Sequence, residues 1–489
     1  MHAPQRALVR PRVVSRETGE TSLLEDVVES HLARRDCAAV ALVGRVRSGK
    51  TTAIAHLASC DLAADLVLID DAEVEDIDRA RDDRLVVYTA RDVIRRTDSG
   101  YELAGWTTDD VIEYLLANRA DQCASVMARY ATDPVHDLLE GMPELIRLVA
   151  DQFADDESLA DVRAAARRVV NDNAGSDQIR QTASYYATAL LLNRRGMAAN
   201  QAGRLVKFGV TRQFMKLLSS RLVQQLLAAD RVVSILRREI DYGLPSGRWP
   251  YGLVEETARQ VSTDDFARAR LREIITLSDE EYQPMAASIL YAADAAWRPS
   301  SDLQWFLEGA YFSDARWQSI ALVGARLQEA DLRRADLRDA DLRGARLYRA
   351  KLARADAENA CFTGARAVAA DFQNANLRRA VLSGGDFTNA DFTDADLSNA
   401  IATAAGFAGA DLTRTSLRGA TLERCEFRRA TLEDTDLREA YLCGAQLAEL
   451  NLRSVQFAGA NLAEANLVRS DLEFVDWPGA RLKRADLSG

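Results

Sequence analysis

The sequence predicts a chain of three parts: an α/β module over residues 1–106, an all-α region over 107–300 and a four-sided β-helix over 301–489. Three observations support this prediction. The C-terminal third repeats every five residues, the N-terminal part has short apolar runs that end in glycine or acidic residues, and the middle has helical periodicity. A chain of 489 residues has room for about three domains of the usual size.

The repeat is centred on a large apolar residue at every fifth position. With Phe312 as the first centre and Leu487 as the last, the chain contains 36 units without an insertion or deletion. In 31 of these units the centre is Leu or Phe, and in 27 the residue two positions earlier is Ala. A period of five fits neither a helix nor a single strand, but it fits a chain that turns a corner every five residues.

Four corners close a square coil of twenty residues. The large and the small residue of each unit then point inward, where alanine is needed because the large side chains fill most of the interior. The pattern strongly resembles the pentapeptide repeat A-(D/N)-L-x-x, whose family folds as a right-handed quadrilateral β-helix. This resemblance implies nine stacked coils and a length of about 43 Å at the usual strand spacing.

The charge of the repeat region does not favour a uniform mimic of DNA, the property by which some pentapeptide-repeat proteins protect DNA gyrase. Residues 321–489 carry 23 basic and 25 acidic side chains, and the early coils are rich in arginine. Only one belt is acidic, and it contains Asp386, Asp391, Asp394, Asp396 and Asp411. Asp371, Asp391 and Asp411 fall in one column at twenty-residue spacing. Two interpretations stay open: aspartates that cap turns on a solvated face, or a binding belt for a basic partner.

The ends and the overall charge suggest where the protein works. The sequence stops at Gly489 without a segment to cover the last coil, so we expect copies of the chain to associate there, or the end to fray. No apolar run approaches the ~18 residues of a membrane span and no signal peptide is visible, so we expect a cytoplasmic protein without membrane contact. The net charge of -12 does not favour direct binding to nucleic acid.

The N-terminal part contains a predicted phosphate-binding loop. A short apolar run typical of a buried parallel strand, 37–43, precedes it, and an apolar helical run follows from Ala53. The loop matches GxxxxGKT and consists of Gly44, Arg45, Val46, Arg47, Ser48, Gly49, Lys50, Thr51 and Thr52. In this context the backbone amides wrap the phosphates, Lys50 neutralises their charge and Thr51 holds Mg²⁺. The sequence therefore predicts a site for ATP and Mg²⁺, with GTP left open.

An acidic pair follows the next predicted strand, 66–69. We expect Asp70 to hold the Mg²⁺ shell through water and Asp71 to orient the attacking water, with Glu73 in reserve. The alternative is a buried strand with acids at its exposed end. The third apolar run, 85–90, ends beside Arg91, at the strand end where ligands bind in parallel sheets.

Together these motifs resemble the STAND class of signalling ATPases, in particular its NB-ARC and NACHT branches. The resemblance also includes Thr89-Ala90-Arg91, an L-x-x-L helix at Leu103 and Trp106, and Gly141-Met142-Pro143. It implies that Arg91 senses the γ-phosphate. It also implies that Pro143 contacts the adenine or ribose side and couples the helical domain to the nucleotide.

The chain also departs from that class. The segment between Thr52 and Asp70 is short where the family carries a further strand and helix, but the missing strand is an edge strand, so the strand before the loop stays flanked. The acid pair is Asp-Asp without a clear Asp-Glu, which predicts slow hydrolysis.

The middle of the chain lacks an obvious site. A helix is expected to start at Thr107, and 297–301 is expected to be a hinge into the repeats. Six cysteines without a CxxC pair argue against a zinc site or a disulfide framework. Three functions remain: a nucleotide-operated switch whose rod recognises a partner in bacterial defence or signalling; a scaffold or gyrase-interacting rod with a vestigial NTPase; and an ATP-dependent enzyme on a small substrate. For the third, no acceptor-activating site is visible.

Overall fold

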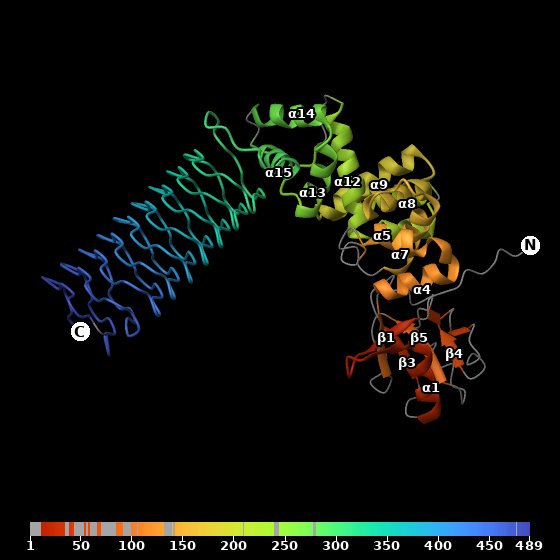
Figure 1. Cartoon of the computed structure of the whole chain (residues 1–489), viewed down its shortest axis with the longest axis horizontal. Coiled ribbons are helices and arrows are strands. Elements are labelled where there is room, and N and C mark those ends of the chain that lie inside the picture. The colour runs from red at the N-terminus through yellow and green to blue at the C-terminus, as the bar shows by residue number, and fades with distance from the viewer. Residues whose placement is uncertain are drawn as a thin grey trace, which may run out of the picture. The chain divides into compact units, whose positions relative to one another are not determined.

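The computed structural model divides into two compact units, Met1–Ala228 and Ala229–Gly489 (Figure 1). It describes residues 11–34, 39–43, 53–54, 57–58, 66–69, 85–90, 99–104, 106–131, 139, 142–208, 210–238, 244–276, 280–475 and 477–489. The predicted domain boundaries at residues 106 and 300 remain a prediction. Within the described ranges, no helix is both long and apolar enough to span a bilayer.

A mixed sheet organises the start of the first unit, and six strands belong to its described part. They are β1 (Arg12–Ser15), β2 (Thr21–Leu23), β3 (Ala39–Val43), β4 (Leu66–Ile69), β5 (Leu85–Ala90) and β6 (Ser99–Leu103). Their order is β2-β1-β6-β3-β5-β4. The neighbours from β6 to β4 pair in parallel, whereas β1 pairs antiparallel with both β6 and β2. The three predicted strands are confirmed, and β3 is flanked on both sides as expected.

The central strand β3 is buried along its whole length, as its unbroken apolar run predicts. Val40 and Leu42 face one layer of the core, which also holds Leu24 and Val28 of α1 (Leu24–Arg34). The alternate residues of β3 pack on the opposite face with Tyr88 of β5. The side chains of β3 are therefore buried on both faces of the sheet, as is typical of a parallel sheet.

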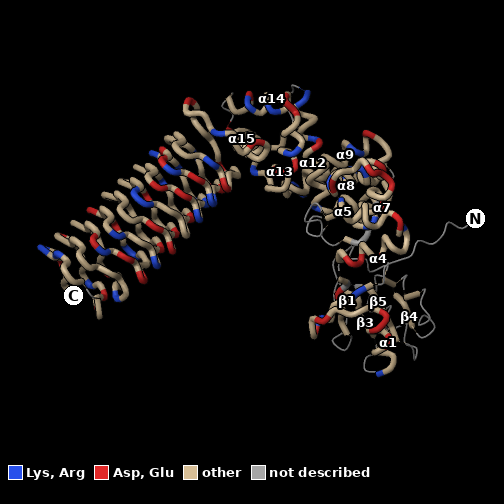
Figure 2. The backbone as a smooth tube through the Cα atoms, viewed as in Figure 1, with Lys and Arg blue, Asp and Glu red and all other residues tan. Residues whose placement is uncertain are grey.

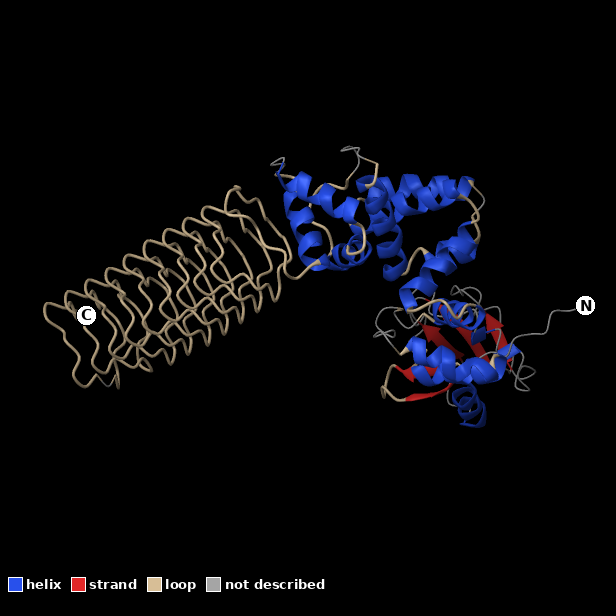
Figure 3. Cartoon of the chain, turned by 45° about the horizontal axis from the view of Figure 1, so that its top comes forward, coloured by secondary structure: helices blue, strands red, loops and turns tan. Residues whose placement is uncertain are grey.

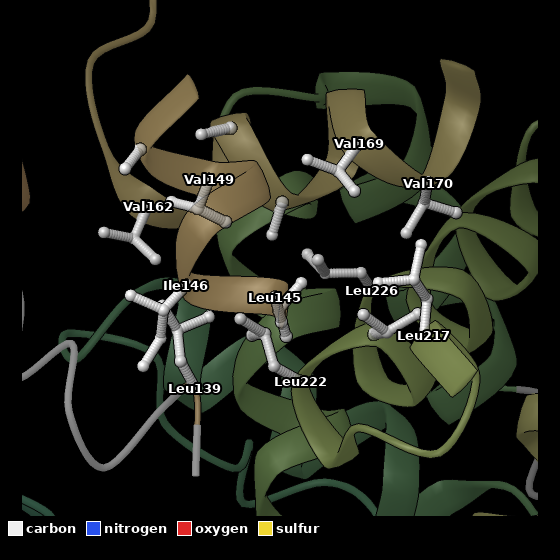
Figure 4. Packing of buried hydrophobic residues seen from close by; sticks show 14 of the residues in the cluster. Leu139, Leu145, Ile146, Val149, Val162, Val169, Val170, Leu217, Leu222 and Leu226 are labelled. Carbon is white, nitrogen blue, oxygen red and sulfur yellow. The ribbon is translucent and has the colours of Figure 1, made fainter. Parts of the chain in front are cut away.

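The rest of the first unit is helical, as predicted. Its described helices are α4 (Thr108–Asn118), a 3-10 turn (Ala120–Gln122), α5 (Cys123–Tyr130), α7 (Pro143–Asp155), α8 (Val162–Ala174), α9 (Asp177–Leu191), α10 (Arg195–Lys207) and α11 (Arg212–Leu217). Thr107 caps α4 in a reciprocal capping box with Asp110, which confirms the predicted helix start. Figure 4 shows the apolar core, in which Leu145, Ile146 and Val149 of α7 meet side chains of α8 and of α12 (Arg221–Leu236).

The second unit begins within α12 and continues with α13 (Tyr251–Val261), α14 (Asp265–Thr276) and α15 (Gln283–Ala293). The repeat region follows and is drawn as loops in Figure 3, because each coil contributes only isolated bridges to its four sheets. These bridges are parallel and join residues twenty apart, such as Asp331 with Lys351. The twenty-residue coil predicted from the sequence is therefore confirmed.

The interior of the repeat region has the predicted composition. Centres such as Leu327 and the small residues before them, such as Ala325, are fully buried. Phenylalanines in successive coils stack in register: Phe372 lies 4.8 Å from Phe392, with ring planes 3° apart. The structure corrects the start, because Leu307 is already a buried centre, one unit before Phe312.

With the exception of Ser454, the corner residues at every fifth position from Gly309 to Gly489 have left-handed backbone geometry. Arg334, for example, has φ 58°, and the amide of Ala335 donates to the carbonyl of Leu332 at 3.1 Å. Such geometry suits Gly and Asn, yet Arg, Asp and Ala also occupy this position. The burial of one large and one small residue per unit therefore imposes the corner conformation.

Candidate functional site

The predicted nucleotide site follows three adjacent strand ends. Val43 at the end of β3 pairs with Ala90 at the end of β5, and Ile69 at the end of β4 pairs with Tyr88. The predicted phosphate-binding loop, the acid pair and the predicted sensor Arg91 come directly after these three strands in the sequence. Carboxyl ends of neighbouring parallel strands form the edge at which α/β sheets bind ligands.

The predicted ligand-contacting residues themselves lie outside the described residues. They are the loop residues Gly44 to Thr52, the acids Asp70, Asp71 and Glu73, and the sensor Arg91. Their roles toward ATP and Mg²⁺ stay predictions. The described surroundings are Ala53 and Leu57, which follow the loop and are buried in the core beside β3, and Thr89, which is completely buried on β5.

Two further residues of the resemblance can be placed. Pro143 is the first residue of α7, a position that suits proline because this amide would have no helical partner. Leu103 ends β6 and pairs with Val13 of β1, while Trp106 precedes α4. The L-x-x-L helix predicted at these two residues is therefore wrong, because sheet pairing holds Leu103 in a strand.

Neither metal nor thiol chemistry is visible among the described residues. They include no cluster of three or more His, Cys, Asp or Glu side chains able to hold a metal ion. The described cysteines are unpaired, and Cys425 occupies a small-residue position inside the coil. Its thiol donates to the carbonyl of Ala402 at 2.8 Å, and burial raises the pKa of Cys425 to about 12. Cys425 thus serves as a small apolar residue.

Acidic and basic residues both occur along the repeat region (Figure 2), and many of them form ion pairs with near neighbours. In three successive Asp-Leu-Arg units the arginine returns to its own aspartate through two hydrogen bonds. These pairs are Arg333 with Asp331, Arg338 with Asp336, and Arg343 with Asp341, at 2.6–2.8 Å. The hydrogen bond from Arg338 lowers the pKa of Asp336, and the hydrogen bond from Arg343 lowers the pKa of Asp341. The charges of these three arginines are therefore largely neutralised by their own aspartates.

The acidic column exists as predicted. Parallel bridges join Asp371 to Asp391 and Asp391 to Asp411. These carboxylates cap their own turns: Asp391 accepts from the amide of Thr393 at 2.9 Å, and Asp411 accepts from that of Thr413 at 3.0 Å. The turn-capping interpretation is supported by these bonds, and the second carboxylate oxygen of Asp391 accepts from the side-chain amide of Gln373.

Helices cover the first coil, a feature that the sequence did not reveal. Gln283 of α15 is completely buried and accepts from the backbone amide of Phe306 at 2.6 Å. Ser288, five residues later in the same helix, accepts from the amide of Tyr311 at 3.1 Å. Two polar residues in an otherwise apolar helix were the available signal. They satisfy backbone donors that an open coil end would leave unpaired.

The predicted hinge at 297–301 is instead packed against the coil. Trp297 stacks on Phe312 with ring centroids 6.4 Å apart, and its carbonyl accepts from the indole of Trp317 at 3.3 Å. The indole of Trp305 donates to the carbonyl of Ser300 at 2.7 Å. Aromatic packing therefore fixes the connection between α15 and the repeats.

Comparison with known proteins agrees with the repeat architecture. Residues 307–344, 330–366, 370–405, 405–444, 425–463, 435–473 and 465–489 match the family described as pentapeptide repeats. Region 307–489 is therefore a run of pentapeptide repeats. No curated protein matches the chain.

Among solved structures, the chain is similar to full-length QnrB1, a plasmid-mediated fluoroquinolone resistance protein. The identity is 20%, the match covers 36% of this chain and 89% of that one, and the TM-score is 0.33. It is also similar to HetL, a pentapeptide repeat protein involved in heterocyst differentiation regulation in the cyanobacterium Nostoc. There the identity is 26%, the coverage 37% and 89%, and the TM-score 0.21.

Proposed function

We propose that this protein is a recognition scaffold whose pentapeptide rod binds a protein partner through its outer ladders. The supporting observation is the construction of the rod: its inward side chains are buried as far as Leu467, α15 covers its first coil, and its outer side chains stand at fixed twenty-residue intervals. Such a surface loses little conformational entropy on binding, because the backbone positions of its charges are already set.

The acidic column is the surface that we assign to the partner. Asp371, Asp391 and Asp411 lie on one ladder, and no arginine or lysine occurs between Arg379 and Arg414. A basic surface of a partner would meet consistent charge over three coils there, which favours association and specificity. DNA gyrase is the first candidate, as the pentapeptide-repeat resemblance implies.

The test is a gyrase supercoiling assay with and without a fluoroquinolone. Full-length protein is compared with the double variant Asp391→Asn, Asp411→Asn, which keeps the oxygen that caps each turn and removes the charge. Asp486→Asn is the matched control, because Asp486 caps Ser488 in the same way outside the belt. Loss of protection or inhibition only in the double variant supports the proposal. No effect of the wild-type protein on gyrase sinks gyrase as the partner.

A nucleotide-operated switch is the second candidate, and one observation favours it. The GxxxxGKT loop, the acid pair and Arg91 directly follow three parallel strands, of which β5 pairs with β3 on one side and with β4 on the other. On this proposal Lys50, Thr51 and Asp70 bind Mg·ATP, and Asp71 supports slow hydrolysis. An assay of partner binding in the presence of Mg·ATP, with full-length wild type and Lys50→Ala, separates the two proposals. A scaffold should bind the partner with the same affinity in both proteins. A switch should lose affinity for the partner in Lys50→Ala, in parallel with its loss of ATP binding.

A further inference from the structure

A cleft of about 660 Å³ lies between the covering helices and the first coils of the rod. Its walls come from α13, the end of α15 and coil residues between Tyr311 and Lys351, all within the second compact unit. This volume is in the range that holds small organic ligands. Nothing in the proposed function uses the cleft.

Two arginines in the cleft are held in place by carboxylates. Arg333 bonds Asp331 through Nε and Nη2, at 2.8 and 2.6 Å, and Arg334 bonds Asp314 in the same way, at 2.7 and 2.6 Å. Both ion pairs use the Nε edge of the guanidinium, which leaves each Nη1 group with two N–H donors for another acceptor. Both arginines are among the residues that line the cleft.

The Asp331 carboxylate is more deeply buried than the aspartates of the other two Asp-Leu-Arg ion pairs. Its side chain is 5% exposed, whereas those of Asp336 and Asp341, in the same Asp-Leu-Arg context, are 28% and 30% exposed. Both of those aspartates lie outside the cleft lining. A buried carboxylate fixes the orientation of Arg333 more firmly than an exposed one, because water competes less for the bond.

The cleft has a surplus of positive charge in a chain of net charge -12. Five cationic side chains and three carboxylates line it. Each carboxylate is bonded to an arginine of the same cleft, the third pair being Glu255 with Arg259 at 2.8 Å. Arg248 pairs with Glu329, which is not part of the lining, and Lys351 has no ion pair among the described residues.

Aromatic side chains form another part of the wall. Tyr251 of α13 meets Tyr311 of the first coil edge to face, with ring centroids 5.4 Å apart, and Tyr251 remains 54% exposed. The hydroxyl of Tyr311 donates to the carbonyl of Trp249 at 2.8 Å, which fixes its ring. An exposed aromatic face beside a group of cations suits a ligand that carries both a ring and an anion.

We propose that this cleft binds a small soluble phosphate ester that carries a planar ring, the chemical class to which nucleotides belong. Arg333, Arg334 and Lys351 hold the phosphate, and Tyr251 packs on the ring. Guanidinium groups recognise phosphate through paired N–H donors, and a lysine adds a point charge. This site is separate in sequence from the loop at 44–52 and does not rest on the proposed function.

The test uses full-length Lys50→Ala protein, so that the predicted loop does not contribute. Calorimetric titration with adenosine monophosphate is compared with titrations of adenosine and of inorganic phosphate. We expect the monophosphate to bind one site with a Kd below about 1 mM, and each of the two fragments to bind at least about tenfold more weakly. No binding of the monophosphate at 5 mM overturns the proposal, and equal affinity for inorganic phosphate overturns the assignment of the ring to Tyr251.

Variants then locate the site. Lys351→Gln should weaken binding about fivefold to tenfold without affecting the fold, because Lys351 is exposed and makes no ion pair with any residue that the structure describes. Arg333→Gln should weaken it at least tenfold. Arg338→Gln is the matched control, since it loses the same kind of aspartate pair outside the cleft. If Arg338→Gln weakens binding as much as Arg333→Gln, or if Lys351→Gln has no effect, the phosphate is not bound in this cleft.

Discussion

The carboxamide of Gln283 joins the last covering helix to the first coil of the rod. Its oxygen accepts from the amide of Phe306 at 2.6 Å, while its nitrogen donates to the carbonyl of Ile275 at 3.1 Å. One buried side chain thus satisfies a coil donor and a helix-end acceptor. An open coil edge would otherwise offer its first amides to another strand.

Replacing this side chain should loosen the first coil. Gln283→Met keeps the length and removes both bonds, so we expect a cost of about 1–3 kcal/mol, because the Phe306 amide is left without its acceptor. Hydrogen exchange of the peptide that contains Phe306, together with thermal unfolding, measures the effect. Gln304→Met is the control: this exposed glutamine also donates to a backbone carbonyl, at 3.0 Å, and its loss should change stability by less than about 0.5 kcal/mol. Equal losses in both variants would contradict the assigned role.

Substitution by glycine should increase the stability of the rod at a corner position and decrease it at an interior position. Ala369 has φ 56°, which costs an alanine about 1 kcal/mol, so Ala369→Gly should stabilise the rod by up to about 1 kcal/mol. The next residue, Ala370, is buried without this geometry, and Ala370→Gly should destabilise it by a similar amount. Urea unfolding of the two variants gives the comparison. A loss of stability in Ala369→Gly would show that the corner prefers a side chain.

The nucleotide prediction depends on one lysine. Lys50→Ala should abolish Mg·ATP binding in titration calorimetry, because the charge that neutralises the phosphates is removed. Phosphate release in the same samples should be slow for the wild-type protein and absent for the variant. Retention of full ATP affinity in Lys50→Ala would refute the loop assignment.

The Asp-Leu-Arg ion pairs predict loss of stability in acid. The hydrogen bond from Arg338 lowers the pKa of Asp336, and that from Arg343 lowers the pKa of Asp341. A carboxyl whose folded pKa is lower contributes stability above its unfolded pKa, near 3.8, and this contribution is lost as the pH falls through the folded pKa. As the pH is lowered from 5 to 2, the free energy of unfolding should therefore fall less steeply in the double variant Asp336→Asn, Asp341→Asn than in the wild type. Parallel declines would mean that other carboxyls dominate.

The twenty-residue coil could be predicted because its cause is local: each unit has to supply one large and one small residue to a narrow interior. The first unit, centred on Leu307, was missed because Trp305 stands where the repeat has alanine, and its indole packs against Trp297 of the helix connection. Strands β1 and β6 were missed because their pairing, such as Val13 with Leu103, joins distant segments. The cleft depends in the same way on Tyr251 and Arg333 meeting across a helix and a coil.

Because every side of the coil has five residues without interruption, the length of an insertion or deletion determines on which face the later residues lie. Removing twenty residues shortens it by one coil and leaves every later side chain on its original face. Removing five rotates everything downstream by a quarter turn, so that Asp391 and Asp411 would point where a neighbouring column pointed before, although the interior would still be filled. The number of coils and the face on which each charged residue lies can therefore change while the interior stays filled. The position of a residue within the twenty-residue coil, rather than the composition of the rod, determines which charges a partner meets.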